Sequence, residues 1–393
     1  MHPELSAASR QLRRELRDYF AEIINDEDRR ALVDQTEGGP VFDRIYRKMG
    51  ADGWLGLGWP VEYGGRGEDP EALYVFYDEA LRAGAPLSLV TLNTVAPSLM
   101  AHGTQAQKDF FLPRILSGEL VFAIGYTEPS AGTDLASLQT RAVVDGEDLV
   151  INGNKIFTSA GVFADWIWLA VRTDPDAPRH QGISVVLVPT ETPGFSVTEI
   201  HTVGGISTSA TYYEDVRVPQ TNLVGEINKG WGLITNQLNH ERVALAARNG
   251  IANELLDETI AWARTQPVGS GTLYDVPWVR STLAEVYALL SAADLISLRL
   301  VSDVAANTLG GGDSAAAKIF GTEAVVTTYG RLQDVLGAYG LMRPGSADAA
   351  IEGRVETLAR RAQNNTFGGG TNEVMREIVA GKTLGMALSS RRR

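Results

Sequence analysis

Hydrophobic positions follow a helical period near the start of the chain. Apolar side chains recur at roughly helical spacing through residues 5–24: Leu5, Leu12, Leu16, Tyr19, Phe20 and Ile23. Residues 71–84, 88–102 and 105–118 continue in this manner, with Pro and Gly breaks between them. Residues 54–65 combine Gly, Trp and Pro and predict a loop. The first third of the chain is therefore predicted to be helical.

The pattern changes near residue 121 to short segments rich in Val, Ile, Thr and aromatic residues. These segments are 121–128, 141–159, 165–173, 182–189, 195–203 and 210–219. Asp145-Gly146 and Asn152-Gly153 have the composition of tight turns between strands. We therefore expect an antiparallel sheet or barrel of about 100 residues.

From Trp231 onward the helical period returns. The predicted helical runs cover residues 231–264, 275–308, 314–337, 349–365 and 372–387. Long helices joined by short loops pack as an antiparallel bundle. The fold class is thus α+β in three domains: an N-terminal helical domain at 1–122, a middle antiparallel β-domain at 123–230 and a C-terminal four-helix-type bundle at 231–393.

Composition excludes several classes of protein. The net charge of −13 argues against a nucleic-acid partner, and the absence of cysteine removes disulfides and thiolate chemistry. The five histidines are scattered, so no metal site is expected. No stretch is apolar enough for a membrane span or a signal segment, which favours a cytoplasmic protein, and we interpret the basic end Arg391–Arg393 as a solvated tail.

The first segment with chemical character is Tyr126–Leu135, which follows an apolar strand. Small residues such as Gly132 allow close approach of the backbone, and the hydroxyls of Thr127 and Thr133 can donate to a carbonyl or phosphate oxygen. Taken alone, the segment is better explained as a Gly/Pro turn whose hydroxyls are satisfied internally.

The second segment is Asn152–Ser159, in which a predicted turn leads into a strand ending in Phe157, Thr158 and Ser159. An aromatic side chain beside two hydroxyls could cover a flat ring while the hydroxyls bond to the heteroatoms of that ring. Taken alone, the segment is better explained as a hairpin with Phe157 in the core.

The third segment is Asn239–Arg242, within a long helical run. Glu241 shares a helical face with Ile234, Leu238 and Leu245, so its carboxylate points with the apolar stripe. A buried carboxylate is a candidate general base, because desolvation raises its basicity. A structural ion pair between Glu241 and Arg248 is the alternative.

The fourth segment is Phe367–Ile378, in which three glycines lead into a helix. Thr371, or alternatively Asn372, marks the start of that helix. A helix N-terminus with accessible backbone is suited to a pyrophosphate, although glycine-rich helix starts are common. A Rossmann nucleotide site is not supported, because no strand-linked GxGxxG occurs.

The order and spacing of these segments resemble the acyl-CoA dehydrogenase family over almost the whole chain. The motifs are YTEPSAGTD, NGNKIFTS, the glutamate-bearing helix and GGGTNEVMREIVAGKTLG. Within the family, GTDLASL, TSATYYEDVRVP, TNQLNHERVAL and FGGGTNEV resemble actinobacterial dehydrogenases of steroid side-chain degradation, of the heterotetrameric type and in the subunit that bears the catalytic glutamate.

The resemblance implies a site that holds FAD between the β-domain and the C-terminal helices. The residues it implies for the cofactor are Thr127, Gly132, Thr133, Phe157, Thr158, Ser159, Thr371 and Glu373. Those it implies for the acyl-CoA substrate are Thr133, Asn239, Arg242 and Gly369. The catalytic base would be Glu241, which removes the α-proton while hydride passes from Cβ to the flavin.

Three departures from the family pattern bear on substrate and assembly. Gly369 stands where most members place the base, which leaves room for a bulky or α-branched acyl chain. Residues 264–269 replace an Arg-x-Phe-Gly segment, and residues 334–340 alter a Gln-bearing Gly-Gly-x-Gly motif. In the family both motifs reach across a dimer interface to the neighbour's FAD.

We therefore expect FAD-dependent α,β-dehydrogenation of an acyl-CoA thioester, with an electron-transfer flavoprotein as acceptor and a non-identical paralogous subunit in an α₂β₂ assembly. One alternative is a partner subunit that only completes a paralogue's site. Another is a flavin oxidase or monooxygenase on the same fold.

Overall fold

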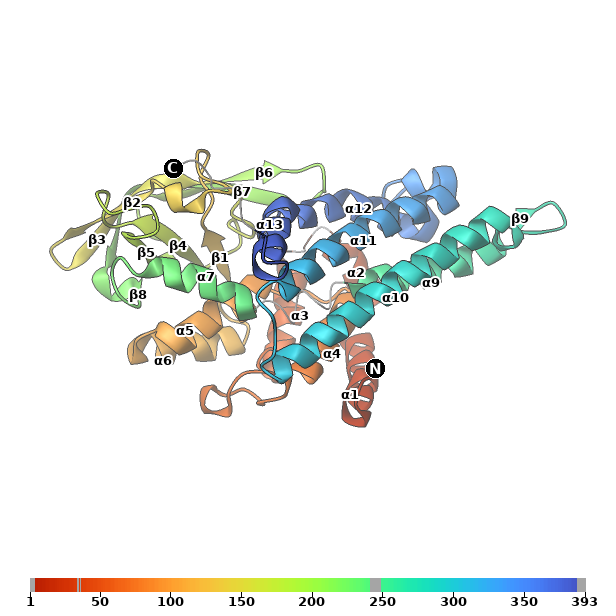
Figure 1. The fold of residues 1–393 in the computed structure, drawn as a ribbon, viewed down its shortest axis with the longest axis horizontal. Coiled ribbons are helices and arrows are strands. Elements are labelled where there is room, and N and C mark those ends of the chain that lie inside the picture. Colours follow the sequence, from red (N-terminus) through yellow and green to blue (C-terminus); the bar gives the residue numbers. More distant parts are fainter. Residues whose placement is uncertain (1–3, 34, 36, 241–248, 387–393) are drawn as a thin grey trace.

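The computed structural model describes residues 4–33, 35, 37–240 and 249–386. It has helices at both ends of the chain and a sheet in the middle, which confirms the predicted three-part arrangement. The sheet lies at one end of the molecule, and two long C-terminal helices extend from the other end (Figure 1). Within the described residues, no helix is long and apolar enough to cross a membrane.

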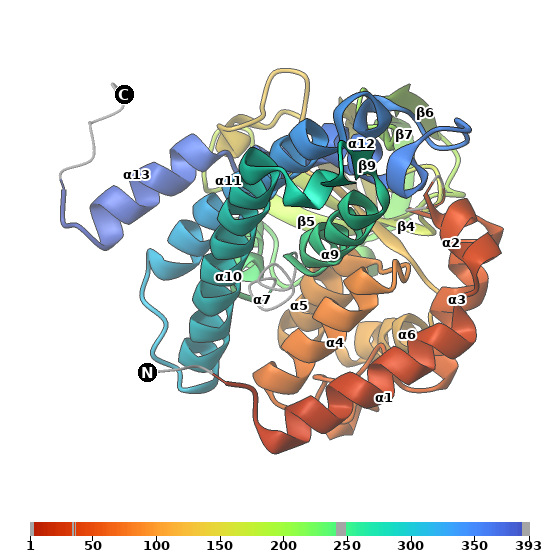
Figure 2. The ribbon, with the colours of Figure 1, turned by 90° about the vertical axis from the view of Figure 1, so that its right-hand side faces the viewer.

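The N-terminal part consists of helices and short helical turns. They are α1 (Ala7–Ile23), α2 (Asp26–Leu32), α3 (Pro40–Ala51), η1 (Val61–Tyr63), α4 (Pro70–Arg82), η2 (Thr91–Val95), α5 (Ala96–His102) and α6 (Gln105–Leu116). The run predicted at 88–102 contains the π-helical turn η2 before α5. In Figure 2, α1 lies along one edge of this helical group.

Helices α2 and α3 were not among the predicted elements, although both carry local start signals. The side chains and backbones of Asn25 and Asp28 form a reciprocal capping box at α2. Pro40 occupies the first turn of α3, where a missing N–H costs nothing. The apolar positions Phe42, Ile45, Tyr46 and Met49 are buried at helical spacing.

The middle part is an eight-stranded sheet with the order β6-β7-β3-β2-β4-β5-β8, and β1 pairs with β4. Its strands are β1 (Phe122–Gly125), β2 (Arg141–Asp145), β3 (Asp148–Lys155), β4 (Trp166–Arg172), β5 (Ile183–Pro189), β6 (Phe195–His201), β7 (Ser207–Pro219) and β8 (Leu223–Val224). Strands β4 and β5 are buried on both faces, which explains their largely apolar sequences.

Two details of the sheet differ from the prediction. The sheet is not wholly antiparallel, because β1 and β2 both pair with β4 in parallel. Asn152-Gly153 is not a turn but lies inside β3, where the register against β7 shifts. Gly153 has φ +146°, and a side chain there would collide with the Thr140 backbone at 2.7 Å. The glycine is therefore required by a close approach within the sheet.

The C-terminal part is built from long helices. The elements are α7 (Gly230–His240), α9 (Gly250–Thr265), β9 (Pro267–Val268), β10 (Gly271–Thr272), η6 (Leu273–Asp275), α10 (Pro277–Ala305), α11 (Asp313–Leu336), η7 (Gly337–Leu341), η8 (Ala350–Gly353), α12 (Arg354–Ala362), η9 (Gln363–Thr366) and α13 (Asn372–Lys382). The small hairpin β9–β10, which the sequence did not predict, lies at the far tip of the α9–α10 pair (Figure 1).

A shared hydrophobic core joins the three parts. It includes Phe20 and Phe76 from the N-terminal helices, Trp168 from the sheet, and Leu233 and Leu300 from the C-terminal helices. A second core fills the C-terminal bundle, and a third covers the other face of the sheet. The sheet is thus packed on both faces.

Candidate functional site

Two of the predicted segments meet where β1 and β3 end. The loop that follows β1 carries Thr127, and the segment that follows β3 carries Phe157 and Ser159. The backbone N–H of Ile156 donates to the Thr127 carbonyl oxygen at 2.8 Å. The structure therefore brings together residues that lie about thirty positions apart in the sequence.

The segment after β3 presents an aromatic side chain to the surface. Phe157 is 62% exposed, and its backbone has φ +59°. Ala160 also has a left-handed backbone, with φ +60°. Such conformations cost non-glycine residues about 1–3 kcal/mol each and gather at functional sites. The core hairpin alternative for Phe157 is therefore wrong.

The two hydroxyls beside Phe157 have different environments. The Ser159 side chain is exposed. Thr158 is 1% exposed, its Oγ1 has no hydrogen-bond partner, and its backbone N–H donates to the Ser209 carbonyl oxygen at 2.9 Å. Ser159 is therefore the hydroxyl available to a ligand, whereas Thr158 anchors the segment to β7.

A buried ion pair lies beneath these two segments. Lys155 Nζ donates to Glu128 Oε1 at 2.9 Å and to the Tyr126 carbonyl oxygen at 3.1 Å. The Lys155 side chain is 0% exposed and that of Glu128 is 4% exposed. Burial lowers the pKa of Lys155 to about 8. Burial acts to raise the pKa of Glu128, but the Lys155 ammonium and the Thr140 N–H outweigh it and hold that pKa below its usual range.

Glu128 also closes the loop that contains the other predicted contacts. Its carboxylate accepts the backbone N–H groups of Gln139 and Thr140 at 2.7 and 2.8 Å. Gly132 and Thr133 are exposed in the loop between Glu128 and Gln139. Both were predicted to lie at the cofactor, with Thr133 near the phosphates or the thioester. No atom lies within 4 Å of where a Cβ at Gly132 would stand. The loop thus offers an accessible backbone and a hydroxyl.

The N-terminal and C-terminal parts reach the same region. Glu37 Oε2 accepts the Ala160 N–H at 2.6 Å, and burial raises the pKa of this carboxyl. The Arg361 guanidinium, from α12, donates to the carbonyl oxygens of Val33 and Gly204. Glu37 and Arg361 were not among the predicted site residues. They lie outside the motifs, so only the tertiary structure identifies them.

The glycine-rich segment 367–370 follows the four-residue turn η9 after α12 and leads into α13. Thr371 caps α13 by accepting the Val374 N–H at 3.2 Å, which confirms it as the capping residue. Glu373 is exposed in the first turn. Gly369 has φ +68°, and no atom lies within 4 Å of where its Cβ would stand. A helix N-terminus with open space before it is suited to an anion.

The predicted base lies outside the described residues, as do Arg242 and Arg248. Helix α7, which leads toward Glu241, lies against β5 and the π-helical turn η2. Asn239 is in the last turn of α7. Its backbone is therefore described, and its predicted contact with substrate stays a prediction.

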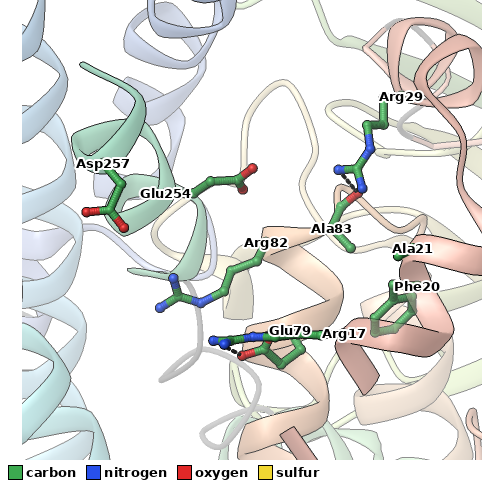
Figure 3. A pocket seen from close by; sticks show the side chains of 9 residues that line it. All are labelled: Arg17, Phe20, Ala21, Arg29, Glu79, Arg82, Ala83, Glu254 and Asp257. Atoms are coloured by element: carbon green, nitrogen blue, oxygen red, sulfur yellow. Dashed lines mark hydrogen bonds and ion pairs between the residues drawn. The ribbon is translucent and has the colours of Figure 1, made fainter. Parts of the chain in front are cut away.

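A charged cavity of about 360 Å³ lies elsewhere, between α1, α4 and α9 (Figure 3). Arg17 pairs with Glu79 there at 2.8 Å, and Arg29 donates to the Ala83 carbonyl oxygen at 3.1 Å. None of the predicted site residues lines this cavity. Among the described residues, no cluster of three or more acidic or histidine side chains could hold a metal ion.

Comparison with known proteins identifies relatives for every part of the chain. Family models for the acyl-CoA dehydrogenase N-terminal, middle and C-terminal domains match residues 6–119, 123–216 and 228–384. Acyl-CoA dehydrogenase FadE26 of Mycobacterium tuberculosis is 50% identical over 391 residues, which cover 97% of this chain and 98% of the relative.

Solved structures are similar over the same extent. The Tcur3481-Tcur3483 steroid ACAD superposes with a TM-score of 0.96 at 50% identity, over 99% of this chain and 100% of the other. The ChsE4-ChsE5 complex from Mycobacterium tuberculosis gives a TM-score of 0.93 at 48% identity, over 99% of this chain and 100% of the other.

Proposed function

Because this chain belongs to the acyl-CoA dehydrogenase family and is an oxidoreductase acting on acyl-CoA, we propose that it carries out FAD-dependent α,β-dehydrogenation with Glu241 as the base. The observation that carries the proposal is the joining of two motif segments at the end of β3, where Phe157 and Ser159 are both exposed beside the Thr127 backbone. The sequence contains no cysteine, and we assign the redox step to a bound organic cofactor.

The described residues fit an isoalloxazine ring and a pyrophosphate. Phe157 is an exposed aromatic side chain on a strained backbone, with an accessible hydroxyl two residues later at Ser159. The open space beside Gly132 and beside Gly369 would let a ligand approach the backbone closely. In this assignment Thr127 and Ser159 bond the ring and Phe157 covers it. Thr133 lies toward the phosphates or the thioester.

The glycine-rich segment supplies the other half of the cofactor site. Thr371 and Glu373 would hold the pyrophosphate and ribose at the N-terminus of α13, where backbone N–H groups and the helix dipole favour an anion. Lys318, on α11, donates to the Gly370 carbonyl oxygen and fixes the path of the chain before that helix. Both halves are therefore held in position by contacts within the chain.

The chemistry assigned to the protein is proton abstraction and polarisation of the thioester. Glu241 takes the α-proton, and Arg242 and Asn239 orient the acyl-CoA beside it. Hydrogen bonds to the thioester oxygen stabilise the negative charge that develops there. FAD, when bound, would accept the hydride that leaves Cβ.

The base is tested by Glu241→Gln, which removes the carboxylate and keeps the shape of the side chain. We expect FAD content to be unchanged and turnover to fall at least ~10²-fold, the scale of general-base assistance. Glu147→Gln, in the exposed β2–β3 turn, is the matched control and should keep normal activity. Near-normal turnover by Glu241→Gln would contradict the assignment.

For the substrate we propose a bulky or α-branched thioester such as a steroid side-chain acyl-CoA. Gly369 leaves open space where most family members carry a glutamate, and a structurally similar protein is described as a steroid ACAD. Competition between thioesters should give a higher kcat/KM for the bulky substrate than for straight medium chains. A preference for straight chains would refute this part of the proposal.

For the assembly we propose a non-identical paralogous subunit in an α₂β₂ tetramer, with an electron-transfer flavoprotein as acceptor. One similar structure is a complex of two chains, ChsE4 and ChsE5. The segments 264–269 and 334–340 depart from the Arg-x-Phe-Gly and Gln-bearing Gly-Gly-x-Gly motifs that family members lend across the interface. FAD per chain should rise when the chain is co-expressed with a paralogue. A stable homo-oligomer with one tightly bound FAD per subunit would contradict it.

The same experiments separate the two alternatives. A non-catalytic partner subunit would lose no activity in the complex when Glu241 is replaced. A flavin oxidase or monooxygenase would consume oxygen rapidly during turnover, whereas a dehydrogenase would depend on the added acceptor.

A further inference from the structure

The ion pair between Lys155 and Glu128 connects all the β-domain segments of the proposed FAD site. Lys155 directly precedes the segment that carries Phe157 and Ser159. Its ammonium holds the Tyr126 carbonyl oxygen, one residue before Thr127. Three groups of proposed cofactor contacts thus depend on two buried charges, because Glu128 also closes the loop that contains Thr133.

We infer that Lys155 and Glu128 are a positioning pair that fixes the relative geometry of the FAD-binding loops. This inference rests on the proposed function. Both side chains are almost completely buried, so the pair acts through the loops and not by touching a ligand. Although Glu128 and Lys155 are 27 positions apart in the sequence, the bond between them joins the Thr127 loop and the Phe157 segment into one unit.

The hydrogen bonding of the pair explains why charged residues occupy this position. A buried ion pair is a weak source of stability, since well-packed apolar residues of similar volume often stabilise as much or more. Apolar residues in place of Lys155 and Glu128 could not form directional hydrogen bonds. The ammonium donates to two acceptors, and the carboxylate accepts from Lys155 and from two backbone N–H groups. Together these bonds tie the ends of both side chains to the backbone at Tyr126 and at Gln139–Thr140.

The neighbouring backbone shows why such fixing is needed. Phe157 and Ala160 have left-handed conformations that a free loop would relax. Lys155 is the last residue of β3, and Ile156, which donates its N–H to the Thr127 carbonyl oxygen, follows it directly. The position of Lys155 therefore determines whether this bond can form. Without the pair, the Thr127 loop and the Phe157 segment would lose the bonds that Lys155 makes to Glu128 and Tyr126.

The test compares FAD binding by variants of the full chain, purified alone and with the paralogous subunit. Glu128→Asp keeps the charge but shortens the side chain, so that it cannot serve Lys155 and both N–H groups together. Lys155→Met removes the ammonium and keeps the length. Arg217→Met is the matched control, because it breaks an exposed 2.6 Å pair with Asp145 in the same sheet.

The measurements are the FAD dissociation constant, the absorption spectrum of the bound flavin, and the thermal unfolding and circular dichroism of the FAD-free protein. We expect Glu128→Asp to weaken FAD binding at least about tenfold and to shift the spectrum, with native circular dichroism. Lys155→Met should do the same in its folded fraction. Arg217→Met should match the wild type.

A purely structural role predicts a different result. FAD-free stability would fall, while the folded fraction of both variants would bind FAD with wild-type affinity and spectrum; that outcome overturns the inference alone. Absence of FAD from the wild type, both alone and with its partner, would refute the proposed function and the inference with it.

Discussion

Replacement of Gly153 by Ala tests whether the irregular register of β3 is imposed by packing. Gly153 has φ +146°, a conformation that is close to glycine-only. A Cβ there would stand 2.7 Å from both Cα and Oγ1 of Thr140 and 2.9 Å from its Cβ. The nearest of these contacts involves backbone, so the two strands would have to separate.

The cost has two parts. The backbone conformation contributes about 1–3 kcal/mol, and overpacking between β2 and β3 contributes about 1–3 kcal/mol more. The free energy of unfolding should therefore fall by about 2–6 kcal/mol. FAD binding should weaken as well, because the Thr140 N–H that would be displaced donates to Glu128 at 2.8 Å.

The matched control is Gly146→Ala in the turn that joins the same two strands. Gly146 has φ +65°, and no atom lies within 4 Å of its Cβ position. Its cost should be the backbone part alone, about 1–2 kcal/mol. Urea unfolding followed by tryptophan fluorescence, with FAD titration below the transition, measures both quantities. If Gly153→Ala is no more destabilising than Gly146→Ala, the steric argument is refuted.

Two further predictions concern the C-terminal helices. Burial raises the pKa of the Asp294 carboxyl, although Asn253 and Asn249 donate hydrogen bonds to it. The folded state therefore keeps this proton to higher pH than the unfolded state does. The stability that the group contributes is lost as the pH rises above the ordinary pKa of 3.8. The stability of Asp294→Asn relative to the wild type should therefore increase between acidic and neutral pH in thermal unfolding, and a constant difference would contradict this. Thr371→Ala should cost about 1 kcal/mol and speed hydrogen exchange in the first turn of α13, whereas Thr371→Ser should keep the bond to Val374 and behave like the wild type.

Local patterns were sufficient for the order of the elements and for several of their ends. The apolar spacing of residues 5–24 predicted α1 because that helix buries Leu16 and Phe20 on one face. Asp145-Gly146 was correctly identified as a turn, since Gly146 adopts the left-handed backbone that a tight hairpin requires. Thr371 was correctly identified as a cap for the same kind of local reason.

The same local signal failed at Asn152-Gly153. The dipeptide is typical of a hairpin turn, but here the glycine accommodates the Thr140 backbone inside a continuous strand. A glycine can be required by a turn or by the close approach of another strand. The second case depends on a neighbouring strand, whose position cannot be deduced from the residues around the glycine. The parallel pairing of β1 with β4 was missed for a similar reason, because it joins segments about forty residues apart.

The candidate site divides in the same way. The sequence by itself determined which residue types were available, because the hydroxyls, Phe157 and the glycine-rich segment stand in motifs that are read along the chain. Only the tertiary structure decided that Lys155 pairs with Glu128, that Glu37 bonds to Ala160, and that Arg361 reaches Val33 from 328 residues away. Such pairings depend on distance in space and on burial, neither of which can be read along the chain. A charged side chain forms stronger hydrogen bonds and ion pairs once water is excluded around it, and it then fixes the backbone that it contacts.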